Sequence, residues 1–241
     1  MRKLTLSVIV ILTFADLCGL SNARAQSVVL DFSFGAIYPA QTAGGLYPGV
    51  TLHKTIKKRG VLQMDLGVGA AYYQRNYSDL AIVEPYLNPN SGSALPFAEV
   101  KFSRKLVPIS FKPTFKISFI ERSLPKLRPV RGAARAGMES TSDIKDTGVF
   151  LRPHVSYYRL SSEESNEVNS SSISRTYKDW GWGSELGFYL TMTNKVSTSI
   201  SVLYNRAGLD REENEEPAGL PVDSMVKLHG VGFLLSVGMG F

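Results

Sequence analysis

The chain has 241 residues, a formal net charge of +6 and a single cysteine. One cysteine excludes a disulfide-stapled scaffold, and a mild positive charge without a stripe of basic and aromatic residues argues against nucleic acid as a partner. Beyond the first 25 residues, no stretch is long and apolar enough to predict a transmembrane helix.

The first segment has the three parts of a secretory signal peptide. Arg2 and Lys3 precede an apolar run, and Ala23-Arg24-Ala25 has the A-x-A form of a cleavage site. We therefore predict that residues 1–25 form a signal peptide that is removed on export. The peptide holds three basic residues and one acidic residue, so a mature chain that starts at Gln26 keeps a net charge of +4 and has no cysteine.

From residue 28 onward, apolar and polar side chains alternate with period two, which is typical of strands with two different faces. In the first segment, Phe32 and Phe34 share one face, while Asp31 and Ser33 share the other. No segment sustains a helical period, so the predicted fold class is all-β. The nine predicted strands are 28–38, 46–56, 62–72, 96–102, 111–119, 149–157, 186–192, 196–204 and 230–241.

The connections predict how these strands cross a membrane. Short connections at 57–60, 105–107 and 193–195 are expected on the periplasmic side, and long polar ones at 78–93, 161–174 and 208–224 on the extracellular side. A single-chain bacterial barrel normally has an even number of strands. Alternation of sides then requires one more crossing, for which residues 128–138 fit. We therefore expect about ten strands, and eight remains open.

The end of the sequence carries a further pattern. From Gly230 to Phe241, apolar residues occupy every odd position and the last residue is aromatic. In this respect the chain resembles the bacterial outer-membrane β-barrel family. The resemblance implies that residues 26–241 form one closed, antiparallel transmembrane β-barrel in the cell outer membrane, in contact with its lipids and lipopolysaccharide. It also implies that the barrel assembly machinery recognises the final strand through Phe233, Leu235, Val237, Met239 and Phe241.

Charge placement predicts which face of the barrel is outside. Charges of both signs lie on the polar faces of the predicted strands, whereas the apolar faces of nearly all strands lack a mid-strand charge, which would be costly against lipid. Aromatic residues fall near strand ends, as in interfacial girdles. The predicted lumen charge network consists of Asp31, Asp65, Glu99, Lys101, Lys112, Lys116, Arg131, Arg135, Arg152, His154 and Glu185. A soluble, lipocalin-like barrel with its apolar face inward is the alternative.

No catalytic residue, cofactor or metal site is predicted. His53, His154 and His229 are scattered, with no spacing that resembles a metal set. His154-Val155-Ser156 resembles the His-x-Ser element of outer-membrane lipid A deacylases, which implies a serine nucleophile beside a histidine base. However, that face is predicted to line the lumen, away from lipid substrates.

The leading functional hypothesis follows from the predicted lumen. Long charged side chains fill the interior of a small barrel, so we expect no wide channel. We therefore predict a structural or surface-binding role that displays the long loops outside the cell, with the ligand left open. The alternatives are a narrow passive pore, an outer-membrane lipid-modifying enzyme, and a soluble periplasmic barrel that binds an apolar ligand.

Overall fold

The computed structural model describes residues 28–39, 42–87, 94–119, 144–192, 195–212 and 217–241. All of its named elements are β-strands. Within the described ranges, no helix has the length and apolar character needed to cross a membrane. The predicted signal peptide and the proposed crossing at 128–138, with Arg131 and Arg135, lie outside the described residues.

The strands differ widely in length. They are β1 (Val28–Pro39), β2 (Gly45–Leu46), β3 (Gly49–Arg59), β4 (Leu62–Ala71), β5 (Tyr73–Leu87), β6 (Ala94–Ser118), β7 (Ile144–Asn166), β8 (Ser171–Met192), β9 (Val196–Arg211), β10 (Met225–Lys227) and β11 (Gly230–Gly240).

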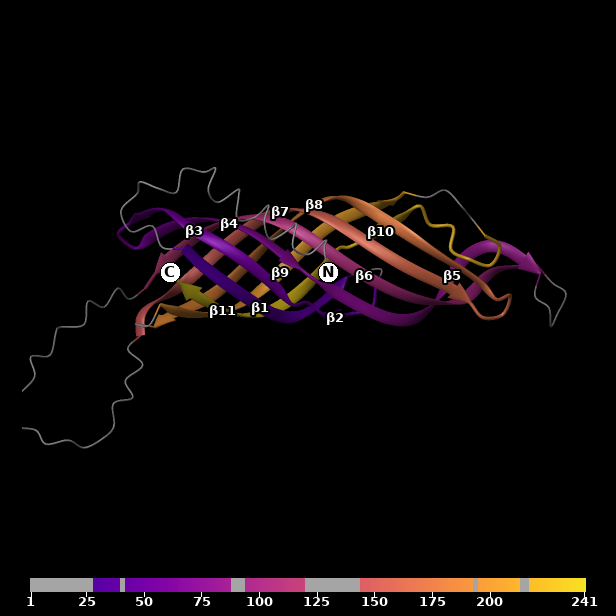
Figure 1. Ribbon diagram of the computed structural model, residues 1–241, viewed down its shortest axis with the longest axis horizontal. Coiled ribbons are helices and arrows are strands. Elements are labelled where there is room, and N and C mark those ends of the chain that lie inside the picture. Colours follow the sequence, from indigo (N-terminus) through magenta and orange to yellow (C-terminus); the bar gives the residue numbers. More distant parts are fainter. Residues whose placement is uncertain (1–27, 40–41, 88–93, 120–143, 193–194, 213–216) are drawn as a thin grey trace, which may run out of the picture.

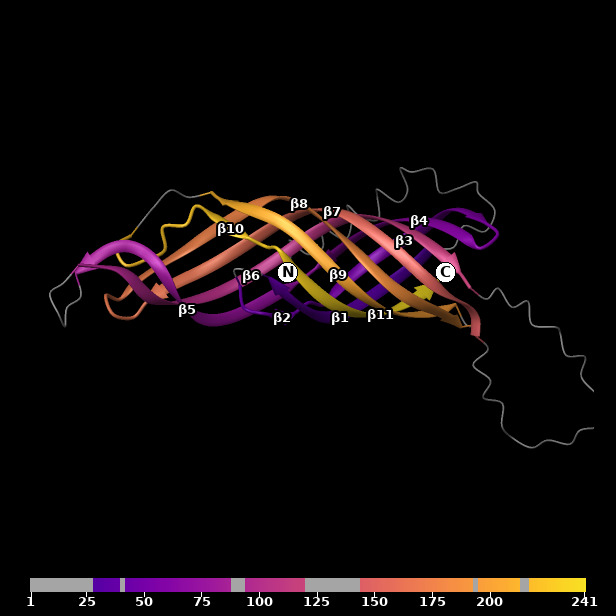
Figure 2. The same ribbon diagram turned by 180° about the vertical axis from the view of Figure 1, so that it is seen from behind.

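Eight of these strands form a closed antiparallel ring. The order is β1-β3-β4-β6-β7-β8-β9-β11, and β11 pairs with β1 to close it. Closure is important because every backbone N–H and C=O group in lipid must be paired within the protein. Figures 1 and 2 show the strands running obliquely around both sides of the barrel. The predicted all-β fold class is confirmed. Of the two strand numbers considered, about ten and eight, the ring has eight.

The expected turn at residues 105–107 is wrong. β6 is one continuous strand of 25 residues, so the predicted strands 96–102 and 111–119 are a single element. Dividing β6 into two predicted strands raised the count from eight to nine. A tenth strand was then needed to make the number even. The predicted loops at 78–93 and 161–174 are also largely strand, since β5 runs to Leu87, β7 to Asn166 and β8 begins at Ser171, and β9 extends to Arg211 in the third. Their serine-rich, charged sequences read as loops because these strands lie in water rather than in lipid.

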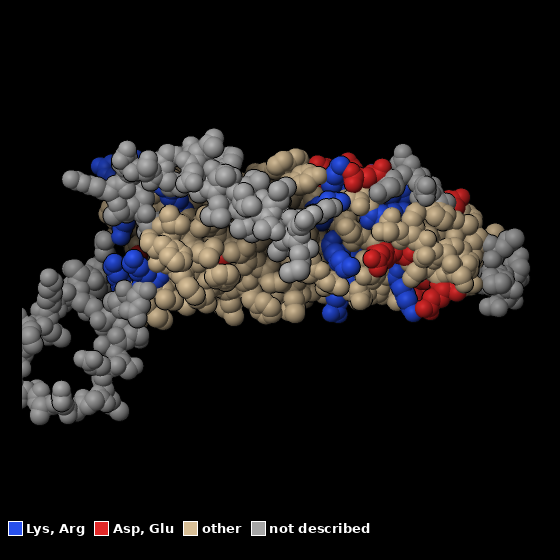
Figure 3. All heavy atoms as spheres, viewed as in Figure 1, with Lys and Arg blue, Asp and Glu red and all other residues tan. Residues whose placement is uncertain are grey.

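One part of the ring carries its apolar side chains on the outside. Phe34 on β1 is 55% exposed and Phe188 on β8 is 63% exposed, whereas Thr114 and Glu185 on the inside are 0% and 1% exposed. In Figure 3 this part is a broad tan band almost free of charge. We call it the membrane section; it comprises residues 28–38, 50–72, 107–119, 144–157, 180–192, 196–204 and 231–241. Here the predicted orientation is confirmed and the apolar-inward alternative is wrong.

Beyond this band, long hairpins extend the wall into water. We call this part the distal section; it comprises residues 73–87, 94–106, 158–179, 205–212 and 217–228. Figure 1 shows it as the end that carries β5 and β10, opposite the C-terminus. The short β3–β4 turn, with Gly60 at a φ of +56°, lies at the opposite end, which we call the turn end.

The pattern of β6 inverts between the two sections. From Ala98 onward its even-numbered residues point inward: Ser110 and Thr114 are buried in the membrane section, and Val100 and Phe102 are buried in the distal section. The odd-numbered residues therefore face lipid in one section and water in the other. Glu99 and Lys101 lie on the outside, so their predicted place in the lumen is wrong. The error has a physical cause: an apolar face points to lipid in a membrane but to the core in water.

Candidate functional site: a sealed lumen and a strapped distal section

An ion-pair network centred on Arg152 occupies the lumen of the membrane section. Its Nη1 donates to both carboxylate oxygens of Glu185, at 3.2 and 3.3 Å, and its Nη2 donates to Oδ2 of Asp31 at 3.4 Å. Its Nε donates to the hydroxyl of Thr114 at 3.0 Å. These residues come from β7, β8, β1 and β6, so the network joins strands from around the ring.

Further lumen contacts extend this network toward the turn end. Nζ of Lys116 lies 2.9 Å from Oδ2 of Asp65. The other carboxylate oxygen of Asp65, Oδ1, accepts a hydrogen bond from Nε2 of Gln63 at 2.8 Å. Nε2 of His53 lies 2.9 Å from Oδ2 of Asp31. Of the predicted network, the structure brings Asp31, Asp65, Lys116, Arg152 and Glu185 into ion pairs within the lumen.

Two other predicted lumen residues take neutral partners. Nζ of Lys112 donates to the hydroxyl of Thr51 at 3.4 Å. Nε2 of His154 lies 2.8 Å from Oδ1 of Asn205, and the hydroxyl of Ser156 lies 2.7 Å from that of Ser110. Both side chains of the His-x-Ser element are buried, and each is hydrogen-bonded to another residue. The arrangement therefore gives no support to a nucleophile and base in contact with a lipid substrate.

An apolar layer closes the lumen at the distal end of the membrane section. It consists of Ile37, Tyr47, Tyr73, Leu106, Tyr158, Leu160, Tyr177, Leu203, Ala207, Leu209, Val226, Leu228 and Leu234. The cavity found within this layer has a volume of only about 10 Å³, at the lower limit of what one water molecule needs. On the turn side, by contrast, the lumen opens into a cavity of about 660 Å³ that Lys58, Lys116 and Asp146 help to line. We call the layer the plug, because it separates the polar lumen from the distal end.

The distal section has a core of its own. Val83, Tyr86, Ala98, Val100 and Phe102 form a buried apolar cluster. Tyr77 stacks on Phe102 with 5.1 Å between ring centroids, and the guanidinium of Arg104 lies 4.6 Å from the Phe102 centroid. The β5–β6 hairpin is therefore packed on its own side chains rather than merely extended into water.

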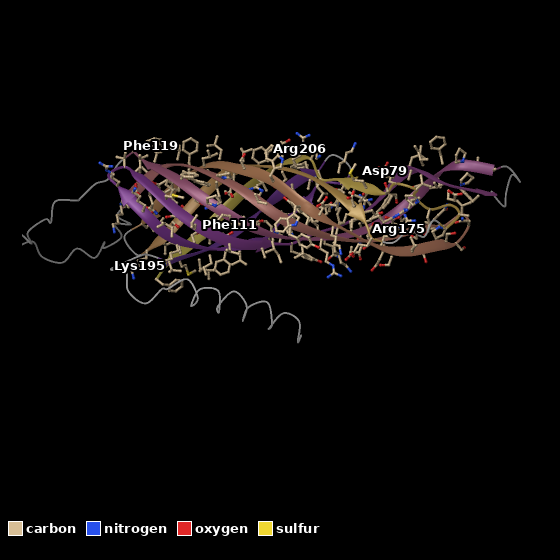
Figure 4. The ribbon with its side chains drawn as sticks, turned by 90° about the horizontal axis from the view of Figure 1, so that it is seen from above. Asp79, Phe111, Phe119, Arg175, Lys195 and Arg206 are labelled. Atoms are coloured by element: carbon tan, nitrogen blue, oxygen red, sulfur yellow. The ribbon has the colours of Figure 1, made fainter. Side chains whose placement is uncertain are left out.

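A fully buried ion pair lies beside this core. Nη1 of Arg175 on β8 lies 2.7 Å from Oε2 of Glu164 on β7, and both side chains are 0% exposed. Oε1 of Glu164 also accepts hydrogen bonds from Ser162 at 2.9 Å and Tyr177 at 3.2 Å. Figure 4 shows Arg175 within the distal section. Such a pair needs every polar atom satisfied, because desolvation of two charges is costly.

A segment between β9 and β10 crosses over this pair. We call residues 217–222 the strap. The carbonyl oxygen of Pro221 accepts a hydrogen bond from Nη1 of Arg175 at 2.7 Å, and Leu220 is completely buried. The backbone of Glu84 on β5 accepts from Gly219 and donates to Leu220.

The strap also reaches the β7–β8 hairpin. The carbonyl oxygen of Gly219 accepts a hydrogen bond from Asn166 at 2.9 Å. Gly219 has a φ of +82°, and a Cβ there would lie 2.2 Å from Nδ2 of Asn169, so only glycine fits. The strap therefore ties the β5–β6 and β7–β8 hairpins to the wall beside β9.

The remaining predicted residues lie on surfaces. Lys101 is 55% exposed and its Nζ lies 2.5 Å from Oε1 of Glu167, outside the lumen. Phe233, Leu235, Val237, Met239 and Phe241 are all exposed on the outer face at and after β11. Sequence reasoning missed Glu164 and Arg175. The available signal was the continued inward phase of β7 through Tyr158, Leu160, Ser162 and Glu164.

Comparison with known proteins gives likenesses of shape at low identity. The chain matches no family model and no curated protein sequence. Neisserial surface protein A is similar at 13% identity and a TM-score of 0.41, covering 92% of this chain and 100% of that chain. Ail of Yersinia pestis, in complex with the heparin analogue sucrose octasulfate, is similar at 10% identity and a TM-score of 0.44, covering 90% and 97%.

A major outer membrane protein from Thermus thermophilus is also similar, at 11% identity and a TM-score of 0.42, covering 89% of this chain and 99% of that chain. The closed ring and its apolar exterior identify the architecture independently of these likenesses. This chain has the fold of a small outer-membrane β-barrel.

Proposed function

We propose that this protein is an outer-membrane barrel that serves as a sealed anchor and presents its distal section outside the cell as a binding surface. The plug is the observation that carries this proposal. A pore needs a continuous polar path, and here a layer of apolar and tyrosine side chains closes the polar lumen. The packed core and strap give the distal section a fixed shape, which favours recognition over a merely flexible loop role.

Conductance in planar bilayers tests the sealed lumen. We expect the intact protein to give no unitary currents, and a variant with Leu106→Gly and Tyr158→Gly to give them, because both side chains lie in the plug. Clear currents from the intact protein that change with Arg152→Ala would overturn the proposal in favour of the narrow pore. Arg152 is the appropriate probe because it lies in the lumen network.

Cysteine labelling of whole cells tests the location and the sidedness. Glu99→Cys in the distal section is expected to react with a membrane-impermeant maleimide. Arg59→Cys beside the turn end is expected to react only after the outer membrane is permeabilised. The reverse pattern would place the distal section in the periplasm, and release of the protein by salt alone would contradict a membrane location.

A further inference from the structure

Four neighbouring ring strands repeat one order of side chains where they leave the membrane section. Within the membrane section, the last residue whose side chain is on the outer face is Val107 on β6, Tyr157 on β7, Trp180 on β8 and Tyr204 on β9. The next outward residue on each strand is basic. These four residues, Lys105, Arg159, Lys178 and Arg206, we call the basic row.

On each of the four strands, the next outward-facing residue beyond the basic row, farther from the membrane section, is small and neutral. These residues are Ser103, Ser161, Thr176 and Gly208. Along this face, with increasing distance from the membrane section, an apolar or aromatic side chain is therefore followed by a basic side chain and then by a small neutral one. Figure 3 shows blue atoms gathered at the boundary between the tan band and the distal section, and Figure 4 shows Arg206 on the outside.

The aromatic residues below the basic row are packed in pairs. Tyr157 and Trp180 are cross-strand partners with 5.4 Å between ring centroids in an edge-on arrangement. Trp182 and Tyr204 form a similar pair at 6.0 Å. Paired aromatic rings of this kind mark the depth of lipid headgroups, so the basic row lies at or just beyond that depth.

Charges in the basic row are incompletely neutralised. Arg159 is the direct cross-strand partner of Lys178, whose partner on its other side is Asp210. Lys178 is paired with Glu212, while Nζ of Lys105 lies 4.0 Å from Glu163. Among the described residues, Arg159 and Arg206 have no ion-pair partner. An anion at headgroup depth would supply one.

A hollow of about 770 Å³ lies over the sheet face just beyond the basic row. Two cross-strand rows line it, Ser78–Lys101–Ser165–Ser172 and Asn76–Ser103–Glu163–Ser174. Five serines and one asparagine make up most of these rows, together with Lys101 and Glu163, and we call them the hydroxyl rows. Hydroxyl and amide groups both donate and accept hydrogen bonds, so this hollow matches a ligand that is itself rich in hydroxyl groups.

We propose that the outer face of β5–β8, with Arg206 at its margin, binds a phosphorylated glycolipid of the surrounding leaflet. Acyl chains would contact the apolar band, phosphates the basic row and sugars the hydroxyl rows. With increasing distance from the membrane, the face presents apolar, basic and hydroxyl groups, and a phosphorylated glycolipid presents its acyl chains, phosphates and sugars in the same order. A soluble protein partner would not need to match this order. The inference rests on the proposed outer-membrane location and adds a specific partner at one face.

Lipid retention in nanodiscs tests the inference. The probes are lipopolysaccharide truncated at its inner core, phosphatidylglycerol, which has an anionic headgroup but no sugar, and phosphatidylcholine. The chain has two tryptophans, and Trp180 and Trp182 both lie on this face, so their emission reports binding directly. We expect truncated lipopolysaccharide to bind roughly tenfold more tightly than phosphatidylglycerol and to shift that emission.

Variants separate the two parts of the face. Arg159→Gln with Arg206→Gln is expected to lower the affinity for lipopolysaccharide roughly tenfold, since charge-assisted hydrogen bonds to phosphate are lost. Ser103→Ala with Ser165→Ala, both in the hydroxyl rows, is expected to reduce the preference over phosphatidylglycerol. Arg75→Gln is the matched control, because Arg75 is exposed but alternates with Gln74 and Asn76 and so lies off this outward face.

Four outcomes would overturn the inference: equal retention of phosphatidylglycerol, equal binding of the free core oligosaccharide, no effect of the arginine double variant, or an equal loss with Arg75→Gln. Heat-modifiability on a gel after insertion into phosphatidylcholine alone is a separate readout. A chain that fails to fold there contradicts the proposed membrane barrel, whereas a folded barrel that shows no preference contradicts only the glycolipid site.

Discussion

The membrane section and the distal section are built on the same strands with the same inward phase, yet their chemistry is reversed. In the membrane section the inside holds the Arg152 network and the outside holds Phe111 and Phe188. In the distal section the inside holds Val100 and Phe102, and Glu99 lies outside. The solvent around each section, rather than the backbone, decides which face is apolar.

Ion pairs in the two sections also differ in how they are supported. Arg152 contacts two carboxylates and a threonine, so the loss of one partner leaves others. Arg175 is paired with the carboxylate of Glu164, and both side chains are fully buried beneath the strap. Loss of Glu164 would therefore leave a completely buried guanidinium without this carboxylate, while its hydrogen bond to Pro221 remains.

The largest expected effect is on that pair. Glu164→Ala leaves the guanidinium of Arg175 buried without its carboxylate, which we expect to destabilise the distal section by about 3–5 kcal/mol. Hydrogen exchange measured by mass spectrometry checks this, with amides of the strap and hairpins exchanging faster and those of the membrane section unchanged. Glu163→Ala is the control, because Glu163 is an exposed neighbour. Equal effects of the two variants would contradict the account.

A charge placed on each outer face sharpens the comparison. Phe188→Lys puts an ammonium group against lipid and is expected to cost about 2–4 kcal/mol in the free energy of folding into bilayers. Leu80→Lys changes a side chain that is 70% exposed in the distal section, and we expect a change within about 0.5 kcal/mol. Urea titrations in vesicles measure both. Similar costs would mean that the distal face also contacts lipid.

The strap offers an effect of intermediate size. Gly219→Ala forces a side chain into a left-handed backbone conformation and against Asn169, so we expect the distal section to lose about 1–3 kcal/mol. Limited proteolysis is expected to cut the strap faster in this variant than in Ser224→Ala, which changes an exposed residue beyond it. Unchanged protection would mean that the strap does not hold the hairpins.

The smallest effect concerns alkaline pH. Burial raises the pKa of Tyr177 to about 12, with the nearby Glu164 carboxylate adding to the shift, and burial also raises the pKa of Tyr77 to about 12. A pKa above the ordinary value near 10 means that folding favours the neutral phenol. This contribution is fully present below pH 10 and is lost as the pH rises toward 12.

Ultraviolet titration of the phenols at 295 nm follows this loss. The intact protein is expected to show a late ionisation phase near pH 12 that accompanies faster hydrogen exchange in the distal section. Tyr177→Phe is expected to reduce that phase. Complete ionisation of Tyr77 and Tyr177 near pH 10 would contradict their burial.

Much of the membrane section could be predicted from the sequence. Alternation on β1, β3, β4, β9 and β11 indicated the strands and the outward apolar face, because each side of those segments meets one environment. The charges of Asp31, Asp65, Arg152 and Glu185 were placed on the inside by phase alone. Their pairing was not predictable, since it depends on ring closure between strands far apart in the sequence.

The distal section was harder to predict because its pattern changes within a strand. Along β6, the apolar set moves from even to odd positions near residues 104–107 without a turn, and the change was interpreted as a connection between two strands. Polar, serine-rich ends of β7 and β8 likewise read as a loop, although they form a paired hairpin. A buried pair such as Glu164 and Arg175 is visible only once that hairpin is folded.

Accessibility scanning along β6 tests the inversion most directly. Single cysteines placed from position 97 to 117 would be probed with a lipid-soluble and a water-soluble reagent. The account predicts that positions 109, 111, 115 and 117 react from lipid, that 99, 101 and 105 react from water, and that even positions from 98 to 114 are protected. A shift of protection to positions 99 and 101, with a reactive turn at 105–107, would contradict it.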